Sequence, residues 1–204
     1  MTRRYVALGD SYTIGEGVSA SERWPAQLAA ALRRRGVPIA EPVIVASTGW
    51  TTSDLLTALD SISSPLPRSF DLVSLLIGVN DQYRGLGVHV FRDGFEKLLS
   101  RALEYAGGEA RHVIVVSIPD WGVTPFAAAD PRGSIAIGGE INQFNAIVRD
   151  AARQAETAFV DVTPLSRQAA TDRALLAPDG LHPSGAMYAS WVELLEPVAV
   201  RALN

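Results

Sequence analysis

The sequence predicts an α/β fold in which helices cover both faces of a parallel sheet. Short segments rich in β-branched residues alternate with longer segments of helical periodicity, the order that parallel strands and their crossover helices require. Several of the short segments are apolar throughout, as expected of strands buried on both faces of a sheet. A chain of 204 residues without cysteine is long enough to form a core without disulfides. We expect one domain over residues 1–204.

Five segments are predicted to be strands. Each is short and rich in Val, Ile, Leu or Ala, and a segment with helical periodicity separates each from the next. The predicted strands are Tyr5–Leu8, Val43–Ala46, Leu72–Ile77, Val113–Ile118 and Ala158–Val160.

Five further segments carry apolar side chains every three or four residues, which indicates helices with one buried face. Pro25 falls in the first turn of the first of these, where proline is tolerated, and Gly36 ends it. Ser184 is the expected N-cap of the last helix. The predicted buried stripes are Trp24, Leu28 and Leu32; Leu55, Leu56, Leu59 and Ile62; Phe91, Phe95, Leu98, Leu99 and Ala102; Ile141, Phe144, Val148, Ala151 and Ala155; and Met187, Trp191, Leu194 and Val198.

The charge balance and the hydropathy argue against several classes of partner. The 18 Lys and Arg and 22 Asp and Glu give a net charge of −4, whereas binding to nucleic acid or anionic membrane requires a basic patch. The apolar run Leu72–Val79 is well short of the ~18 residues of a membrane span, so we expect no integral membrane segment. Asp10 interrupts the run that starts at Tyr5 before a signal-peptide core could form, so we expect a cytoplasmic protein.

Polar residues or glycine follow several of the predicted strands. Ligands of open parallel sheets bind at the carboxyl ends of the strands. Ser11 follows the first strand, Gly49 the second and Asn80 the third, while Asp179 and His182 lie between the fifth strand and the last helix. Each alone is a common turn or cap residue, but together they offer the nucleophile, base, orienting acid and oxyanion donors that acyl transfer requires.

Four sequence blocks resemble those of the SGNH (GDSL-type) hydrolases and occur in the same order. At one position, Tyr12, the chain departs from the family motif, which has Leu. The resemblance extends from Tyr5 to about Tyr188, and it implies a three-layer α/β/α, flavodoxin-like fold with a five-stranded parallel sheet in the order 2-1-3-4-5. The blocks are Gly9-Asp10-Ser11-Tyr12, Gly49, Gly78-Val79-Asn80-Asp81 and Asp179-Gly180-Leu181-His182.

The same resemblance implies a serine esterase, with Ser11 as nucleophile, His182 as general base and Asp179 orienting the imidazole. The implied oxyanion hole consists of the backbone N–H groups of Ser11 and Gly49 and the side-chain amide of Asn80. Catalysis of this kind needs neither a metal nor a cofactor.

Two connections, residues 82–88 and 119–138, are expected to wall the substrate pocket. Phe126 is expected to anchor the second connection on the body of the protein, and Arg84 to be a solvated surface residue. The expected substrate is a small-molecule ester: a short-chain, aryl or acetylated-carbohydrate ester, or a lysophospholipid. The candidate substrate-binding residues are Tyr12, Trp50, Tyr83 and Trp121.

The sequence leaves two alternatives open. An acyltransferase would form the same acyl-enzyme and pass the acyl group to an alcohol other than water. A flavodoxin-like binding module without hydrolytic activity would bind phosphate at the loop after the first strand, but Asp10 and Glu16 flank that loop and would repel a phosphate.

Overall fold

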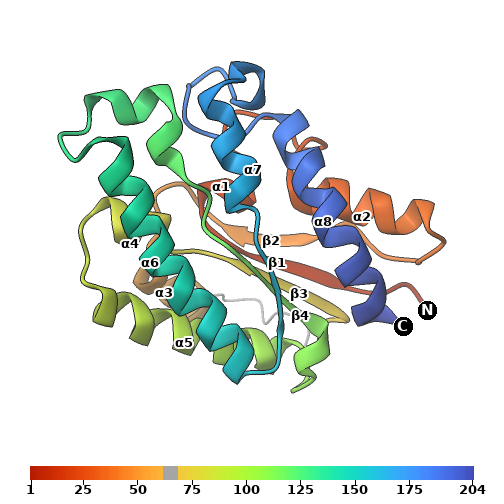
Figure 1. The fold of residues 1–204 in the computed structure, drawn as a ribbon. Helices are drawn as coiled ribbons and strands as arrows, with labels where there is room; N and C mark the ends of the chain where they lie inside the picture. Colours follow the sequence, from red (N-terminus) through yellow and green to blue (C-terminus); the bar gives the residue numbers. More distant parts are fainter. Residues whose placement is uncertain (62–68) are drawn as a thin grey trace.

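The computed structural model of the protein describes residues 1–61 and 69–204 (Figure 1). Its strands form a five-stranded sheet in the order β2-β1-β3-β4-β5, and each neighbouring pair is parallel. The fold class and the strand order are therefore confirmed. The strands are β1 (Tyr5–Gly9), β2 (Val43–Ala46), β3 (Leu72–Leu76), β4 (Val113–Val116) and β5 (Ala158–Val160).

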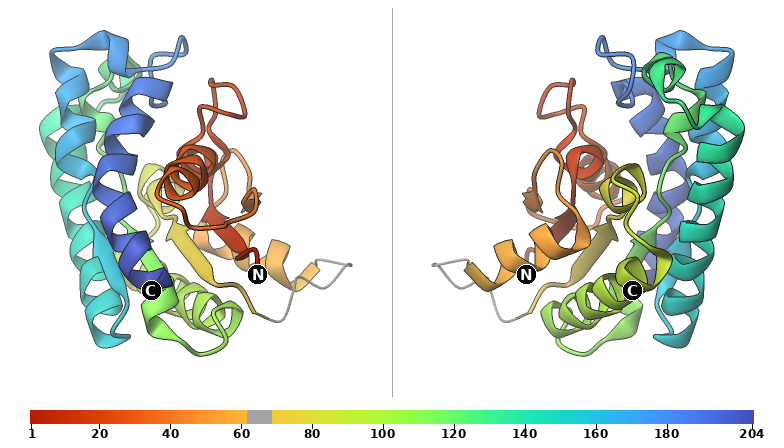
Figure 2. Two further views of the ribbon diagram at one scale, coloured as in Figure 1. Left: turned by 90° about the vertical axis from the view of Figure 1, so that its right-hand side faces the viewer. Right: turned by 90° about the vertical axis from the view of Figure 1, so that its left-hand side faces the viewer.

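The long helices form two layers, one on each face of the sheet (Figures 1 and 2). In the sheet, β2 lies on one side of β1, and β3, β4 and β5 follow in order on the other side. Because crossovers between parallel strands are right-handed, the reversal of direction after β2 moves the later crossover helices to the opposite face. On one face α2 (Trp24–Arg34) packs with α8 (Gly185–Leu203). On the other, α5 (Val88–Tyr105) packs with both α3 (Thr52–Ser61) and α6 (Gly133–Gln154).

Short helices follow three of the strands at the carboxyl end of the sheet, whereas both chain termini lie at the other end (Figures 1 and 2). These short helices are α1 (Ser11–Ile14), α4 (Val79–Tyr83) and α7 (Thr163–Ser166). Single turns of 3-10 helix are η1 (Ala110–His112), η2 (Trp121–Val123), η3 (Pro125–Ala129), η4 (Arg167–Ala170) and η5 (Arg173–Leu175).

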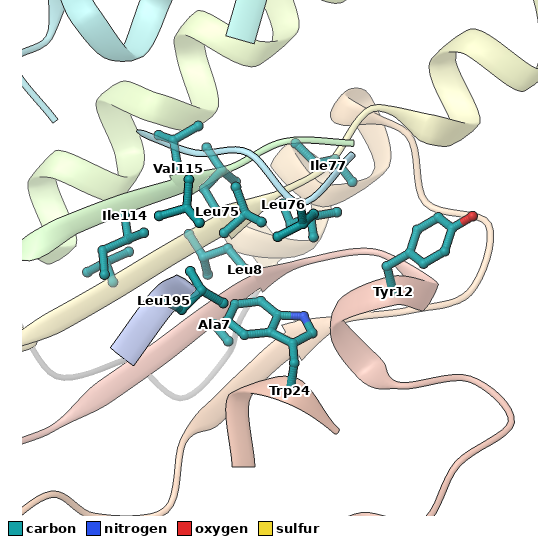
Figure 3. Packing of buried hydrophobic residues seen from close by; sticks show 14 of the residues in the cluster. Ala7, Leu8, Tyr12, Trp24, Leu75, Leu76, Ile77, Ile114, Val115 and Leu195 are labelled. Carbon is teal, nitrogen blue, oxygen red and sulfur yellow. The ribbon is translucent and has the colours of Figure 1, made fainter. Parts of the chain in front are cut away.

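A continuous cluster of buried apolar side chains fills the space between the sheet and its helices. Figure 3 shows Leu8 and Leu75 of neighbouring strands beside Leu195 of α8. The predicted helical stripes supply much of this cluster, with one error: Leu194 is 41% exposed, because the buried stripe of α8 runs from Trp191 to Leu195. The predicted stripe residue Ile62 lies outside the described residues.

Two predicted strands end before their apolar runs do. β3 ends at Leu76 rather than Ile77, and β4 at Val116 rather than Ile118. Both isoleucines are buried, but the backbone of Ile118 exchanges hydrogen bonds with the side chain of Asn145 on α6 instead of with a strand. An apolar run therefore indicates burial, while the available backbone partner decides where the strand stops.

The connection after β4 contains more regular structure than the sequence indicates. It includes η2 and η3, and α6 begins at Gly133, well before the predicted stripe at Ile141. Glycines give this segment the composition of a loop, yet close packing explains why residue 138 is a glycine. A Cβ at Gly138 would lie 3.0 Å from Oδ2 of Asp120, so the first turns of α6 approach the preceding segment closely.

Candidate active site

The first block forms a tight turn from β1 into α1. Asp10 is the N-cap of α1, and its side chain accepts a hydrogen bond from the N–H of Tyr12 at 3.0 Å. A Cβ at Gly9 would overlap the side chain of Thr13 and the carbonyl of Leu76, so the turn requires glycine. Ser11 is therefore held at the first position of a helix, directly beyond the carboxyl end of β1.

In the last block, residues 179–182, the Asp179 carboxylate binds both the backbone and the side chain of the residues that follow it. Asp179 Oδ1 accepts hydrogen bonds from the N–H groups of Leu181 and His182, both at 2.9 Å, and Oδ2 lies 2.6 Å from His182 Nδ1. Gly180 has φ +68°, a conformation that favours glycine. The carbonyl of His182 accepts a hydrogen bond from the N–H of Ala177 at 2.7 Å. The imidazole is thus held from Nδ1, which leaves Nε2 as its remaining ring nitrogen for chemistry.

The hydrogen bonds around Asp179 also favour its charged form. Partial burial acts to raise the pKa of Asp179, but the bonds donated by the His182 side chain and by the backbone N–H groups of Leu181 and His182 outweigh it. The pKa of Asp179 therefore lies below its ordinary value, and at neutral pH the side chain is a carboxylate that accepts from Nδ1.

One cavity of about 130 Å³ brings the four blocks together. Ser11 and His182, from opposite ends of the chain, both line it. The segment after β1 also lies beside the segment before α8. Gly17 is so close to Ala177 that a Cβ at residue 17 would lie 2.8 Å from the Ala177 Cβ. The described lining residues are Ser11, Tyr12, Thr48, Gly49, Val79, Asn80, Tyr83, Trp121, Phe126, Leu181 and His182.

Gly49 and Asn80 bring polar groups to the same cavity. Gly49 follows β2 and has φ +81°. Asn80 lies on α4, and its Nδ2 donates one hydrogen bond to the carbonyl of Trp50 at 2.9 Å. Because an amide NH₂ has two hydrogens, this bond fixes the Asn80 side chain and leaves one N–H to donate.

Three of the four candidate substrate-binding residues, Tyr12, Tyr83 and Trp121, line the cavity. Tyr12 lies at the edge of the core in Figure 3, with its hydroxyl directed away from the other labelled side chains. Trp50 is not among the described lining residues. Its side chain packs against the core, and its carbonyl is the acceptor for Asn80.

Tyr83, Trp121 and Phe126 form one side of the cavity, which we call the aromatic wall. Their ring centroids lie 5.4 to 6.2 Å apart. Trp121 is buried, whereas Tyr83 and Phe126 are 47% and 45% exposed. Trp121 Nε1 donates to Oε1 of Gln82 at 2.7 Å, which ties the wall to α4. Phe126 was expected to anchor its connection, but it also lines the cavity. The sequence feature that could have indicated this role is its position five residues after Trp121 in the same connection.

Two acidic groups lie buried beneath the site. Burial, together with the nearby Asp81 carboxylate, raises the pKa of Asp10 to about 8, although the N–H of Tyr12 opposes the shift. Oδ2 of Asp10 has no hydrogen-bond partner among the described residues. Burial also raises the pKa of Asp81, which accepts bonds from the N–H and hydroxyl of Thr52 at 2.9 and 2.6 Å. Asp81 thereby joins α4 to the start of α3.

The described part of the chain also bears on metal and membrane binding. Within residues 1–61 and 69–204, no group of three or more His, Asp or Glu side chains is arranged to hold a metal ion. None of the helices in the described part of the chain combines the length and apolar character needed to cross a membrane.

Solved structures with the same fold cover almost the whole chain. TesA is 22% identical, with a TM-score of 0.72 and coverage of 98% of this chain and 100% of TesA. Axe2, an acetylxylan esterase from Geobacillus stearothermophilus, is 18% identical, with a TM-score of 0.68 and coverage of 99% and 94%. Phospholipase A1 from Streptomyces albidoflavus NA297 is 24% identical, with a TM-score of 0.71 and coverage of 97% and 98%. At these identities the likeness shows a shared fold.

Sequence comparisons identify the family. A comparison with curated protein sequences finds no match. Residues 7–189 match the model of the GDSL-like lipase/acylhydrolase family, a range that contains all four blocks. The chain belongs to the GDSL-like lipase/acylhydrolase family, whose members are carboxylic ester hydrolases.

Proposed function

We propose that the protein is a serine esterase that hydrolyses small acyl esters in the cavity between Ser11 and His182, and that residues 1–204 form one domain. One observation supports the proposal above all others. Ser11 and His182 come from opposite ends of the chain and line one cavity, and the imidazole is already bound through Nδ1 to Asp179 at 2.6 Å.

In the proposed reaction, Ser11 Oγ attacks the ester carbonyl carbon while His182 Nε2 accepts the hydroxyl proton. The tetrahedral intermediate then collapses, the C–O bond to the alcohol breaks, and the imidazolium gives its proton to the leaving oxygen. Water attacks the resulting acyl-enzyme, with His182 again as base, and releases the acid and free Ser11. Asp179 keeps the proton of the neutral imidazole on Nδ1 and stabilises the imidazolium.

The oxyanion of the intermediate would accept hydrogen bonds from the backbone N–H groups of Ser11 and Gly49 and from the second N–H of Asn80. Donors that are fixed before the reaction stabilise developing charge without reorganising. The bond from Asn80 to the Trp50 carbonyl supports this role, because it fixes the amide plane while one N–H stays available.

The size of the cavity favours short-chain, aryl or acetylated-carbohydrate esters. About 130 Å³ suits a small acyl group or one ring, and aromatic side chains pack well against either. One structural neighbour is an acetylxylan esterase and another is a phospholipase A1. The long acyl chain of a lysophospholipid would have to extend from the cavity past the exposed rings of Tyr83 and Phe126.

Labelling with a fluorophosphonate tests the proposal, because only an activated serine reacts with this probe. We expect one adduct on Ser11, located by mass spectrometry, and no adduct in Ser11→Ala. We also expect Ser11→Ala to lose up to about a millionfold in kcat, and p-nitrophenyl acetate or butyrate to be hydrolysed faster than the palmitate. An unlabelled wild type, or a Ser11→Ala variant with a comparable rate, would refute the nucleophile; preference for palmitate would refute the short-acyl assignment.

A further inference from the structure

The direction of the Gly49 N–H depends on groups outside the glycine. Glycine adopts a wide range of φ and ψ, so its own backbone does little to fix the neighbouring peptide planes. Side chains instead hold the residues on either side. Thr48 Oγ1 donates a hydrogen bond to the carboxylate of Glu16, and the Trp50 carbonyl accepts from Asn80 Nδ2 at 2.9 Å. A third side chain binds the carbonyl of Gly49 itself.

Arg84 holds that carbonyl. Its Nη2 donates to the Gly49 oxygen at 2.6 Å, and a Cβ placed on Gly49 would lie 3.7 Å from the same nitrogen. The guanidinium therefore lies directly against the glycine, although the Arg84 side chain is 50% exposed. Arg84 is exposed at the surface, as expected, but it also binds a backbone carbonyl, and a charged donor makes one of the stronger hydrogen bonds in proteins.

A second contact orients the guanidinium. Arg84 Nη1 lies 3.7 Å from Oδ2 of Asp54, in the first turn of α3. Asp54 is itself held by the N–H and the hydroxyl of Thr51, at 2.9 and 2.8 Å. The hydrogen bond from the Thr51 backbone, followed by smaller effects that include Arg84, keeps the pKa of Asp54 below its ordinary value. Arg84 thus joins a fixed carboxylate on α3 to the Gly49 carbonyl, from its place at the end of α4.

We propose that Arg84 is a positioning residue for the oxyanion hole: by holding the Gly49 carbonyl, it fixes the Gly49–Trp50 peptide and restricts the φ and ψ open to the glycine, so that the Gly49 N–H on the other side stays directed at the reacting carbonyl oxygen. The proposal rests on the proposed function, in which that N–H stabilises the oxyanion. It also explains the choice of arginine, because the planar guanidinium presents two nitrogens to two acceptors at once, whereas lysine presents a single flexible ammonium.

Steady-state kinetics of Arg84→Met, Arg84→Lys and the control Arg153→Met test the proposal. Arg153 pairs with Asp150 at 3.3 Å on the exposed surface of α6. Removing an oxyanion donor outright reduces kcat by about 10²–10³, so loss of its positioning should cost less. For p-nitrophenyl acetate we expect kcat of Arg84→Met to fall by about tenfold or more, with KM little changed and Arg84→Lys in between. Arg153→Met should match the wild type.

Two further readouts separate positioning from a general structural role. The rate of fluorophosphonate labelling should fall in Arg84→Met in parallel with kcat, because phosphonylation uses the same oxyanion hole. The pH profile of kcat should keep its shape, because His182 is untouched. An increase in KM confined to anionic esters would instead make Arg84 a substrate-binding residue and overturn the proposal.

The outcomes also separate this inference from the proposed function. If Ser11→Ala is inactive and Arg84→Met has the kcat of Arg153→Met, only the positioning role fails. If Ser11→Ala keeps a comparable rate, the proposed function fails, whatever Arg84→Met does. A large decrease in the melting temperature of Arg84→Met, with recovery of wild-type kcat at low temperature, would show that Arg84 supports the fold and not the oxyanion hole.

Discussion

The two sides of the cavity are held by different interactions. On the side of Ser11 and His182, hydrogen bonds fix the groups proposed to react: Asp179 binds the imidazole, and Asn80 is tied to a backbone carbonyl. The aromatic wall is formed mainly by ring contacts, although Trp121 is also tied through Nε1 to Gln82 and through its carbonyl to Thr124. The groups proposed to react, on what we call the reacting side, are therefore fixed by hydrogen bonds, whereas the two exposed rings of the wall, Tyr83 and Phe126, are held mainly by contacts with other rings.

Among changes that leave Ser11 in place, the largest effect on kcat should come from removing the carboxylate that binds His182. In Asp179→Asn, the side-chain oxygen can still accept the N–H groups of Leu181 and His182, but Nδ1 of His182 loses its carboxylate. We expect kcat to fall by as much as about 10⁴-fold, with a melting temperature close to that of the wild type.

Asp179→Ala is the matched comparison, because it removes the turn contacts as well. It should lower both kcat and the melting temperature, as measured by ester hydrolysis and thermal unfolding. If Asp179→Asn retains wild-type kcat, the carboxylate does not act on the imidazole, and the distinction between the two sides of the cavity is lost.

A smaller effect, of a different kind, is expected at the wall. Phe126→Ala removes a half-exposed ring and should leave the hydrolysis of p-nitrophenyl acetate nearly unchanged. The added space should favour longer acyl chains, with the ratio of hexanoate to acetate kcat/KM rising on the order of tenfold.

Ile135→Ala, which truncates an exposed apolar residue of α6, is the control for a general loss of surface hydrophobicity. An equal loss of kcat/KM on every ester in Phe126→Ala would place that ring on the reacting side and contradict the comparison.

The last prediction concerns stability rather than rate. The pKa of Asp10 is raised to about 8 in the folded state, while an unfolded Asp titrates near 3.9. Between these values the folded state holds a proton that the unfolded state has lost, so the free energy of unfolding falls as pH rises from about 4 to 8. The loss is at most about 1.4 kcal/mol per pH unit and ends above the folded pKa.

Asp10→Asn does not titrate and can still cap α1 through its side-chain oxygen. Its melting temperature, relative to the wild type, should therefore increase with pH across this range. Asp150→Asn, on the exposed surface of α6, gives the baseline. A difference that stays constant with pH would show that Asp10 does not keep a proton in the folded protein.

Much of the reacting side could be predicted because the fold itself brings its parts together. Ser11, Gly49 and Asn80 each follow a strand, and parallel strands place their carboxyl ends along one edge. Asp179 and His182 are three residues apart across a glycine, a spacing short enough to predict their contact. Local sequence and sheet geometry were sufficient for these residues.

Residues 82–88 and 119–138 were expected to wall the pocket, and Tyr83, Trp121 and Phe126 do line it, but the contact between Phe126 and Tyr83 and the Arg84 contacts could not be predicted in the same way. Phe126 meets Tyr83 across a long sequence separation, and the segment between them gives no sign of how it folds back. Arg84 looks like a surface residue because its partner is a backbone carbonyl, and any residue type supplies one. Trp50 shows the converse: an aromatic side chain beside a motif glycine predicted substrate contact, yet the ring packs against the core.

The segment that carries His182 is braced from within. The N–H of Ala177 binds the His182 carbonyl, the N–H of Ser184 binds the Leu175 carbonyl, and Asp179 completes the hairpin. The orientation of the His182 imidazole is thus encoded within residues 175–184. Changes in length between β5 and Leu175 can leave the geometry within this hairpin intact, but the place of His182 beside Ser11 also depends on contacts between the hairpin and the rest of the protein, such as the bond from the Phe126 N–H to the Gly180 carbonyl.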